Sequence, residues 1–394
     1  MLTWIAPIIV FGLVVFVHEL GHFIAAKLTG VYAPRFSIGF GPALLKKRVG
    51  ETEYVLAALP LGGYVRMASR EDEATAFLEG GAENSATHVG AKDDWDPNAM
   101  IPFGPKPIPE ARWFESKPLI ARLFIMLAGV TMNALLAYFI YAGLLLHSGL
   151  PTPIPIAAAV TPDKPAAQAG IQVGDSIATL NGRPLERWET LLDTIGASAG
   201  RTLDIGLVRK GRAVQVQVTP VAETVPDPQT GVKRSLGRIG MVASEGFTPI
   251  SMGRAFGEAW NLTVDNGSKI FSALGMLIHG VGVSDLGGPI AIATVSVQAA
   301  RGGMETLLLL VALISINVAV FNLLPIPILD GGQILLNVAE TIKGSAFSTQ
   351  TRERILKGGL LIIGLLFVTV MFNDISRSMP NIVRFLGKLF GRSA

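Results

Sequence analysis

Residues 4–26 read WIAPIIVFGLVVFVHELGHFIAA, and this stretch decides both the fold and the chemistry that the sequence predicts. From residue 8 to residue 17 the run is apolar on every side of a helix, so a helix there must be surrounded by lipid or by protein. His18, Glu19 and His22 follow within the same run. Ionisable groups at such depth are costly, and they usually mark a functional site.

The spacing of these three residues is that of a hydrolytic zinc site. His18 and His22 are four positions apart, so on a helix they project from one face and can share a metal ion. Glu19 lies about 100° around the helix from His18, near enough to accept a proton from water at that site. The alternative is a signal peptide or a plain anchor helix that matches His-Glu-x-x-His by chance. That alternative has no basic segment before the apolar core and leaves three ionisable side chains unexplained.

The composition is that of a polytopic membrane protein. The chain has 394 residues, of which 50% are hydrophobic and only 16% charged. Its formal net charge is +3, and its basic residues lie in loops without interleaved aromatic residues, so we predict no nucleic-acid partner. There is no cysteine, which excludes disulfides and thiolate metal sites. Any zinc ion must therefore be held by His, Asp or Glu.

Four segments approach the ~20 residues that a membrane-spanning helix needs: 2–26, 119–146, 307–329 and 356–372. Basic residues concentrate between the first two and between the last two, so the positive-inside rule places both loops in the cytoplasm and residues 148–303 outside. We expect a mainly α-helical membrane protein with four transmembrane helices. Its predicted parts are the first helix (1–30), a β region (31–70), a cytoplasmic loop (71–117), the second helix (118–147), an α/β module (155–222), an outer linker with helices (223–303), the third helix (304–332), the fourth helix (354–374) and a tail (375–394).

Two non-helical parts stand out in this division. Within 53–67, apolar segments flank Pro60-Leu61-Gly62-Gly63, which predicts a β-hairpin that is either soluble or dips into the membrane beside protein. From about residue 155 to residue 220, short strands alternate with short helices, which predicts a small α/β module between the second and third spans.

The two histidines make an incomplete site, because a catalytic zinc normally has three protein ligands. Asp330 is the best candidate for the third. It closes the third apolar span, where Pro325 and Pro327 break the helix and can expose backbone near the metal. His88, His147 and His279 are weaker candidates because they lie in a polar loop or near the outer side. The alternative role for Asp330 is to cap a helix that starts at Gly331.

Taken together, these residues resemble the site-2 proteases, a family of intramembrane zinc metalloproteases, and specifically the bacterial regulator-of-sigma-E protease branch. The resemblance rests on the His18 motif and on the sequences RFSIGFG at 35–41, PLGGYV at 60–65, GGPI at 287–290 and NLLPIPILDGG at 322–332. Residues 165–177, PAAQAGIQVGDSI, resemble the PDZ domains of bacterial proteases.

This resemblance implies a Zn²⁺ cofactor held by His18, His22 and Asp330, Glu19 as general base and Asn322 in a substrate-binding segment. It implies that 31–70 is a membrane-reentrant β region and that the inserted α/β module is a PDZ domain. The implied partners are the lipid bilayer and single-span membrane proteins, such as anti-sigma factors already trimmed by another protease. The implied location is the bacterial inner membrane, with the active site toward the cytoplasm and the PDZ domain outside.

The sequence departs from the family pattern in having one PDZ module instead of two and a longer loop at 71–112. The module also has no clear glycine-rich carboxylate-binding loop before its first strand. Two other classes of function remain open. A noncatalytic membrane PDZ scaffold would have no use for Glu19 beside an open metal position. A proton-coupled transporter would also place ionisable residues in the membrane, but four spans without an internal repeat disfavour it.

Overall fold

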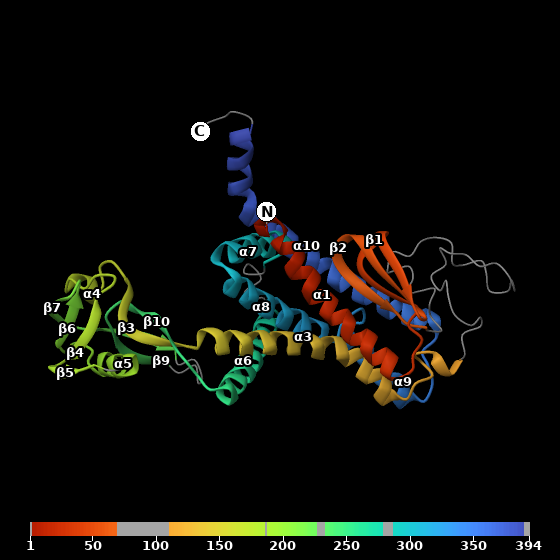
Figure 1. Cartoon of the computed structure of the whole chain (residues 1–394), viewed down its shortest axis with the longest axis horizontal. Helices are drawn as coiled ribbons and strands as arrows, with labels where there is room; N and C mark the ends of the chain where they lie inside the picture. The colour runs from red at the N-terminus through yellow and green to blue at the C-terminus, as the bar shows by residue number, and fades with distance from the viewer. Residues whose placement is uncertain (1, 69–109, 186, 227–232, 279–286, 390–394) are drawn as a thin grey trace. The chain divides into compact units, whose positions relative to one another are not determined.

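The computed structural model describes residues 2–68, 110–185, 187–226, 233–278 and 287–389 (Figure 1). It divides into two compact units. The helical unit comprises Met1–Leu144 and Phe256–Ala394, and the inserted module comprises Leu145–Ala255. Residues 69–109 lie outside the described residues, and with them most of the predicted loop 71–117, including His88.

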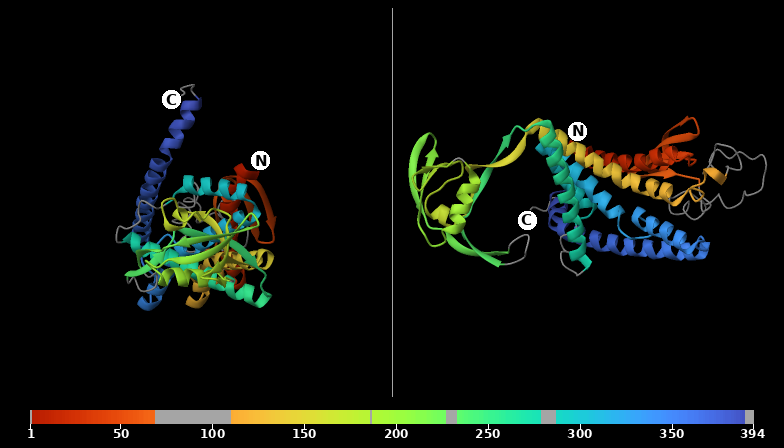
Figure 2. Two further views of the ribbon diagram at one scale, coloured as in Figure 1. Left: turned by 90° about the vertical axis from the view of Figure 1, so that its left-hand side faces the viewer. Right: turned by 90° about the horizontal axis from the view of Figure 1, so that it is seen from below.

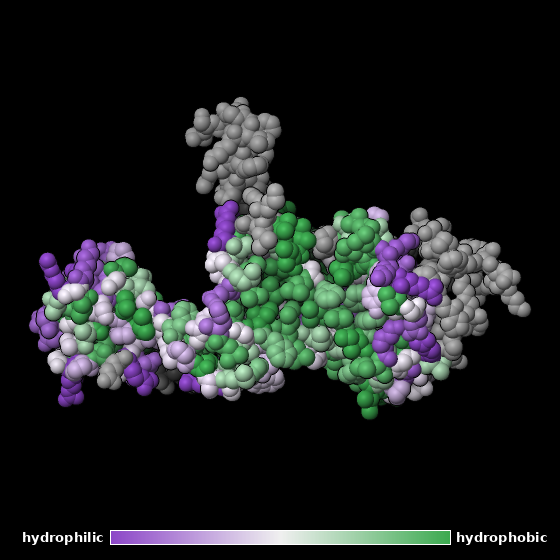
Figure 3. Space-filling view, in the orientation of Figure 1, coloured by the Kyte–Doolittle hydropathy of each residue, from purple (hydrophilic) through white to green (hydrophobic). Residues whose placement is uncertain are grey.

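The helical unit is built on α1 (Leu2–Leu28), α3 (Leu119–Ser148), α8 (Met304–Asn322) and α10 (Thr349–Leu389). Among the described residues, each of these four contains a segment long and apolar enough to cross a membrane: Ile5–Leu28, Leu119–Ser148, Met304–Asn322 and Gln350–Arg377. Three further helices complete the unit: α6 (Met252–Ile278), α7 (Pro289–Gly302) and α9 (Asp330–Lys343). In the space-filling view, apolar residues cover much of the visible face of this unit (Figure 3).

Two helix boundaries differ from the sequence prediction. The third span ends at Asn322 instead of residue 329, because Pro325 and Pro327 cannot continue the backbone hydrogen bonds of the helix. The fourth helix is longer than 356–372 and runs without a break to Leu389, into the part predicted as a separate tail. Polar residues at both ends extend this helix beyond its apolar centre.

Helix α1 lies at the centre of the helical unit. Val10 and Val14 on α1 pack against Val311 and Ile314 on α8. Toward its other end, Ala25 and Ala26 pack against Ile125, and Figures 1 and 2 show α1 and α3 lying side by side there. The helix that carries the His-Glu-x-x-His motif is therefore fixed by contacts on two sides.

A small sheet covers another side of α1. It is formed by β1 (Arg35–Val49) and β2 (Thr52–Arg66). The prediction of a hairpin within 53–67 was wrong in its pairing, because both halves of β2 pair with the first part of β1: Phe36 faces both Tyr54 and Val65. The first part of β1 thus lies between the two halves of β2. The sequence pattern missed it because apolar residues on these strands do not alternate.

The inserted module is larger than the predicted range 155–222. Its sheet has the order β10-β3-β4-β6-β7, formed by β3 (Leu150–Val160), β4 (Ser176–Leu180), β6 (Leu203–Arg209), β7 (Arg212–Val218) and β10 (Met241–Thr248). Helices α4 (Pro165–Gln168) and α5 (Trp188–Ala197), the short β5 (Arg183–Pro184) and the pair β8 (Val221–Pro226) and β9 (Lys233–Arg238) complete it. Strand β10 pairs with β3 from Met241–Val160 to Thr248–Leu150, so residues 223–248 belong to the module and not to a linker.

Candidate zinc centre

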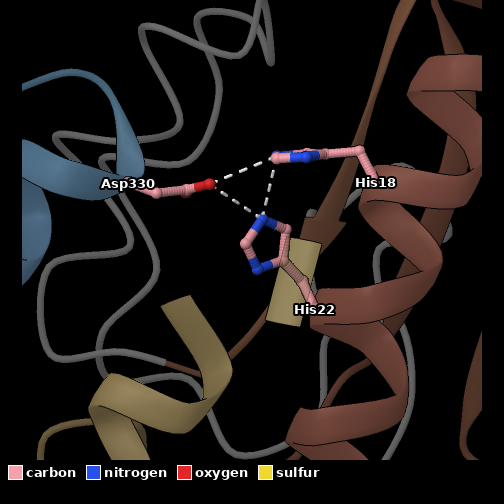
Figure 4. A group of neighbouring side chains, drawn as sticks. All are labelled: His18, His22 and Asp330. Atoms are coloured by element: carbon pink, nitrogen blue, oxygen red, sulfur yellow. Dashed lines mark hydrogen bonds and ion pairs between the residues drawn. The ribbon is translucent and has the colours of Figure 1, made fainter. Parts of the chain in front are cut away.

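Two helices bring the three predicted ligands together. His18 and His22, 7% and 6% exposed, project from one face of α1, with their ring centroids 4.8 Å apart. Asp330 is the first residue of α9, and its carboxylate points at both imidazoles (Figure 4). Asp330 Oδ2 lies 3.2 Å from His18 Nε2 and 3.4 Å from His22 Nε2, and the two Nε2 atoms are 3.2 Å apart. Among the described residues, these three form the one cluster of His, Asp and Glu with metal-ligand spacing.

These distances fit a zinc ion. Ligand atoms about 2.0–2.1 Å from a tetrahedral zinc ion are separated by about 3.3 Å, close to all three measured distances. Asp330 Oδ2 is buried and receives no hydrogen bond from the described residues. A buried carboxylate oxygen beside two imidazole nitrogens has no stabilising partner unless a cation or a proton lies among them. The donor set therefore suits Zn²⁺, with one coordination position left open.

The break between α8 and α9 places Asp330. Leu323–Leu329 is not helical, and the Gln333 side chain donates a hydrogen bond to the Pro327 carbonyl (2.7 Å), which fixes the bend. Asp330 does not cap α9, because Leu329 occupies the N-cap position. The Asp330 carboxylate faces the histidines instead. Of the other histidines, His147 is exposed at the end of α3, and His88 and His279 are outside the described residues.

Helix α3 contributes residues that the sequence reading missed. His22 Nδ1 lies 2.8 Å from the Ile125 carbonyl, and Asn133 lies 3.4 Å from His18 Nδ1. Between them, Gly129 has no side chain; a Cβ there would be 2.4 Å from His22 Nε2. The sequence did contain a sign of this contact: Asn133 is a polar residue in an otherwise apolar span, one turn after Gly129.

A cavity of about 450 Å³ opens onto the three candidate ligands. Glu19 lines it as well. The half of β2 from Gly63 to Arg66 lines the same cavity and comes close to α1 because Gly63 lacks a side chain: a Cβ there would be 3.1 Å from Glu19 Cγ. Asn322 also lines the cavity, and its amide nitrogen donates to the Val318 carbonyl (3.0 Å).

Ion pairs away from the ligands fix the surrounding elements. Glu51, in the turn between β1 and β2, pairs with Arg112 (2.8 Å) and with Lys27 at the end of α1 (2.6 Å). Hydrogen bonds from Arg112 and then from Lys27 lower the pKa of Glu51 from 4.5 to about 2. On the other side of the cavity, Glu340 of α9 pairs with Arg352 of α10 (2.6 Å). Burial raises the pKa of Glu340, but the hydrogen bonds from Arg352 outweigh it, so the pKa lies below its usual value.

The inserted module has a cavity of its own, of about 1380 Å³, lined by α5, β9 and β10. Strand β9 ends at Arg238, and Ile239 and Gly240 lead directly into β10, the strand at one edge of the sheet.

Comparison with known proteins agrees with the geometry of the metal site. Residues 6–366 match the family described as Peptidase family M50. The chain belongs to this family. Over 95% of its length it is 31% identical to the Regulator of sigma-W protease RasP of Bacillus subtilis, covering 98% of that protein. It is 30% identical to the zinc metalloprotease RasP of Geobacillus kaustophilus and 32% identical to a putative zinc metalloprotease of Brucella suis, covering 95% of this chain in both and 97% and 95% of those proteins.

This M50 protein is thus a zinc metalloprotease, as the sequence predicted. A PDZ domain of an SdrC-like protein from Listeria innocua matches 23% of the chain and 92% of its own length, at 21% identity and with a TM-score of 0.18. That score is too low to establish a shared fold, so the PDZ assignment of the inserted module stays a prediction from the sequence.

Proposed function

We propose that this zinc metalloprotease cuts peptide bonds within the membrane-spanning segments of single-span membrane proteins. His18, His22 and Asp330 hold the zinc ion and Glu19 is the general base. The observation that carries the proposal is the position of His18 and His22, two of the three clustered residues, on α1, a helix long and apolar enough to cross a bilayer. A site on such a helix is within reach of a substrate that itself lies in lipid.

The chemistry divides between the metal and Glu19. When bound, the zinc ion polarises the peptide carbonyl and increases the acidity of water. Glu19 accepts the proton of the attacking water and delivers it to the leaving amine. Glu19 lines the same cavity as the three ligands. Glu19 follows the ligand His18 on the same helix, so its carboxylate is close enough to the metal site to act as a general base.

The substrate must become extended before it is cut, because a transmembrane helix uses its carbonyl groups in internal hydrogen bonds. The Gly63–Arg66 half of β2 supplies an edge to which an extended segment can add as a further strand, since its described pairing is with one neighbour, Arg35–Ile38. Asn322 lines the same cavity. Its amide nitrogen already donates to Val318, so its Oδ1 is the atom that accepts a substrate N–H.

This is an integral membrane protein whose described residues include four helices long and apolar enough to cross a bilayer. The basic loops support a bacterial inner-membrane topology, with the zinc site toward the cytoplasm and the inserted module outside. Anti-sigma factors whose outer domains have been trimmed are the substrate class we favour, consistent with a relative named Regulator of sigma-W protease. In this arrangement the module screens out membrane proteins that still carry a large outer domain.

The test uses the full chain in lipid nanodiscs, its zinc content, and a single-span substrate without its outer domain. Glu19→Gln should keep zinc and lose about 10²–10⁴-fold in cleavage rate, because the amide has the same shape but cannot take the proton. Asp330→Ala should lose both zinc and cleavage. Full activity of Glu19→Gln refutes the mechanism. A zinc-free, inactive wild type that binds peptides through the module would indicate a scaffold instead.

A further inference from the structure

We infer that Asn133 is a positioning residue for His18: its side-chain oxygen accepts the Nδ1–H of that imidazole and so fixes the tautomer that presents Nε2 to zinc. This inference deepens the proposed function and rests on its zinc site. Asn133 lies on α3 and is 0% exposed. Its Nδ2 is 3.4 Å from His18 Nδ1.

The position of His18 determines which tautomer it must adopt to bind zinc. Its Nε2 faces Asp330 Oδ2 at 3.2 Å and His22 Nε2 at the same distance, so Nε2 is the nitrogen that binds metal. A neutral imidazole whose Nε2 binds metal carries its proton on Nδ1 and needs an acceptor there. His22 already meets this requirement, because its Nδ1 lies 2.8 Å from the Ile125 carbonyl. The group at the corresponding nitrogen of His18 is the Asn133 amide.

The hydrogen bonding of Asn133 shows which of its atoms meets this need. With Nδ2 toward His18, two donors would face each other, while Asn133 Oδ1 is buried without a hydrogen-bond partner among the described residues. The two ends of an amide have the same shape, so a half-turn places Oδ1 at His18 Nδ1 and moves no other atom. That one change gives the His18 proton its acceptor and Oδ1 its donor, while Nδ2 moves to the position that Oδ1 occupied.

The surroundings hold Asn133 in place. Ser315 of α8 donates a hydrogen bond to the Asn133 backbone carbonyl (2.8 Å), and Ser315 is itself buried. On α3, Ile125 and Asn133 are eight residues apart and serve His22 and His18 respectively, with Gly129 midway between them. One face of α3 therefore orients both histidines, although it contributes no ligand.

The experiment measures zinc affinity by competition with a chelator, on the full chain in nanodiscs, for four variants. Asn133→Ala and Asn133→Leu should bind zinc about 10- to 100-fold more weakly than the wild type, the usual effect of removing the partner of a ligating histidine. Asn133→Asp should stay within a few-fold of the wild type, because a carboxylate accepts the same proton. Thr131→Val is the control, since Thr131 is exposed on the same helix and bonds only to the Leu127 carbonyl among the described contacts. In the weakened variants, substitution by Co²⁺ should also alter the visible absorption bands.

Each result decides the matter. Wild-type affinity in Asn133→Leu would show that the residue only fills space, and overturns the inference. If Asn133→Asp loses as much zinc affinity as Asn133→Ala, and thermal melting shows that both proteins are folded, Asn133 donates a hydrogen bond instead of accepting one. That result also overturns the inference. If Asn133→Asp does not fold, Asn133→Leu alone decides. A wild type that binds no zinc overturns the proposed metal site itself, which is distinguishable because every variant then behaves alike.

Discussion

Replacing Gly129 with alanine should disrupt the zinc site, although residue 129 is not a ligand. A Cβ at this position would lie 2.4 Å from His22 Nε2 and 2.8 Å from His18 Cε1. Nonbonded heavy atoms approach to about 3.5 Å, so the rings or the helix must move by roughly 1 Å. The candidate ligand atoms lie 3.2–3.4 Å apart, and a metal site tolerates deviations of only about 0.2 Å in its metal–ligand distances.

Two magnitudes follow from this contact. Overpacking of a filled interior costs about 1–3 kcal/mol, which thermal melting of the zinc-free protein would measure. Displacement of the two imidazoles should lower zinc affinity at least about 10-fold, measured by chelator competition. Gly143→Ala is the matched control: it lies on the same helix, and a Cβ there meets nothing within 4 Å. That control should leave zinc binding unchanged and stability unchanged or slightly higher.

The outcomes separate a local effect from a general one. If Gly129→Ala binds zinc and cleaves substrate like the wild type, the histidines do not pack against α3 as described, and the reasoning fails. If Gly129→Ala and Gly143→Ala lose zinc affinity equally, the loss comes from replacing any glycine of this helix and not from a contact with the histidines.

Three further predictions follow from other parts of the chain. Val65→Pro should reduce cleavage with zinc retained, because Val65 lies in the half of β2 at the cavity; Val55→Pro is a poorer test, since Val55 pairs with both Ser37 and Lys46 and its loss would break the sheet itself. Unchanged cleavage by a folded Val65→Pro protein would eliminate strand addition. Replacement of residues 150–248 by a short glycine linker should preserve cleavage of a trimmed substrate and permit cleavage of an untrimmed one, because the paired residues Leu150 and Thr248 bring the two ends of the module together; loss of trimmed-substrate cleavage in a folded, zinc-loaded protein would exclude the screening role. The lowered pKa of Glu51 means that its ion pairs contribute stability above pH 4.5 and lose it as the pH falls toward about 2. Glu51→Gln should flatten that acid dependence in thermal melts, and an unchanged slope would contradict the assignment.

The sequence predicts the shared position of the candidate metal ligands largely because their pattern is local. His18, Glu19 and His22 are within one turn of each other, so helical geometry alone predicts their shared face. Asp330 could be predicted because few acidic residues close an apolar span, and the prolines before it indicate a break in the helix. The structure brings Asp330 to 3.2 Å from His18.

The parts that the sequence did not predict depend on contacts between distant segments. The pairing of Phe36 with both Tyr54 and Val65 is a matter of register, and apolar residues that do not alternate leave register unspecified. Strand β10 escaped prediction because it is rich in small and polar residues and is stabilised by pairing with β3, about 90 residues earlier. Asn133 and Gly129 could be recognised as polar or small residues in a span, but only the packing of α3 on α1 shows which side chains they meet.

The arrangement of polar groups around the site explains how an apolar bundle can carry it. His22 has the Ile125 carbonyl at its Nδ1, and Ser315 of α8 donates to the Asn133 backbone, so α1, α3 and α8 are connected by buried hydrogen bonds. Asp330 comes from a fourth segment and faces α1. In lipid, helices gain little from burying apolar surface against each other, so small residues and polar contacts must supply the specificity of packing. The groups that orient the candidate ligands are therefore also groups that align the helices, and a substitution such as Asn133→Leu tests positioning only when folding is measured beside zinc affinity.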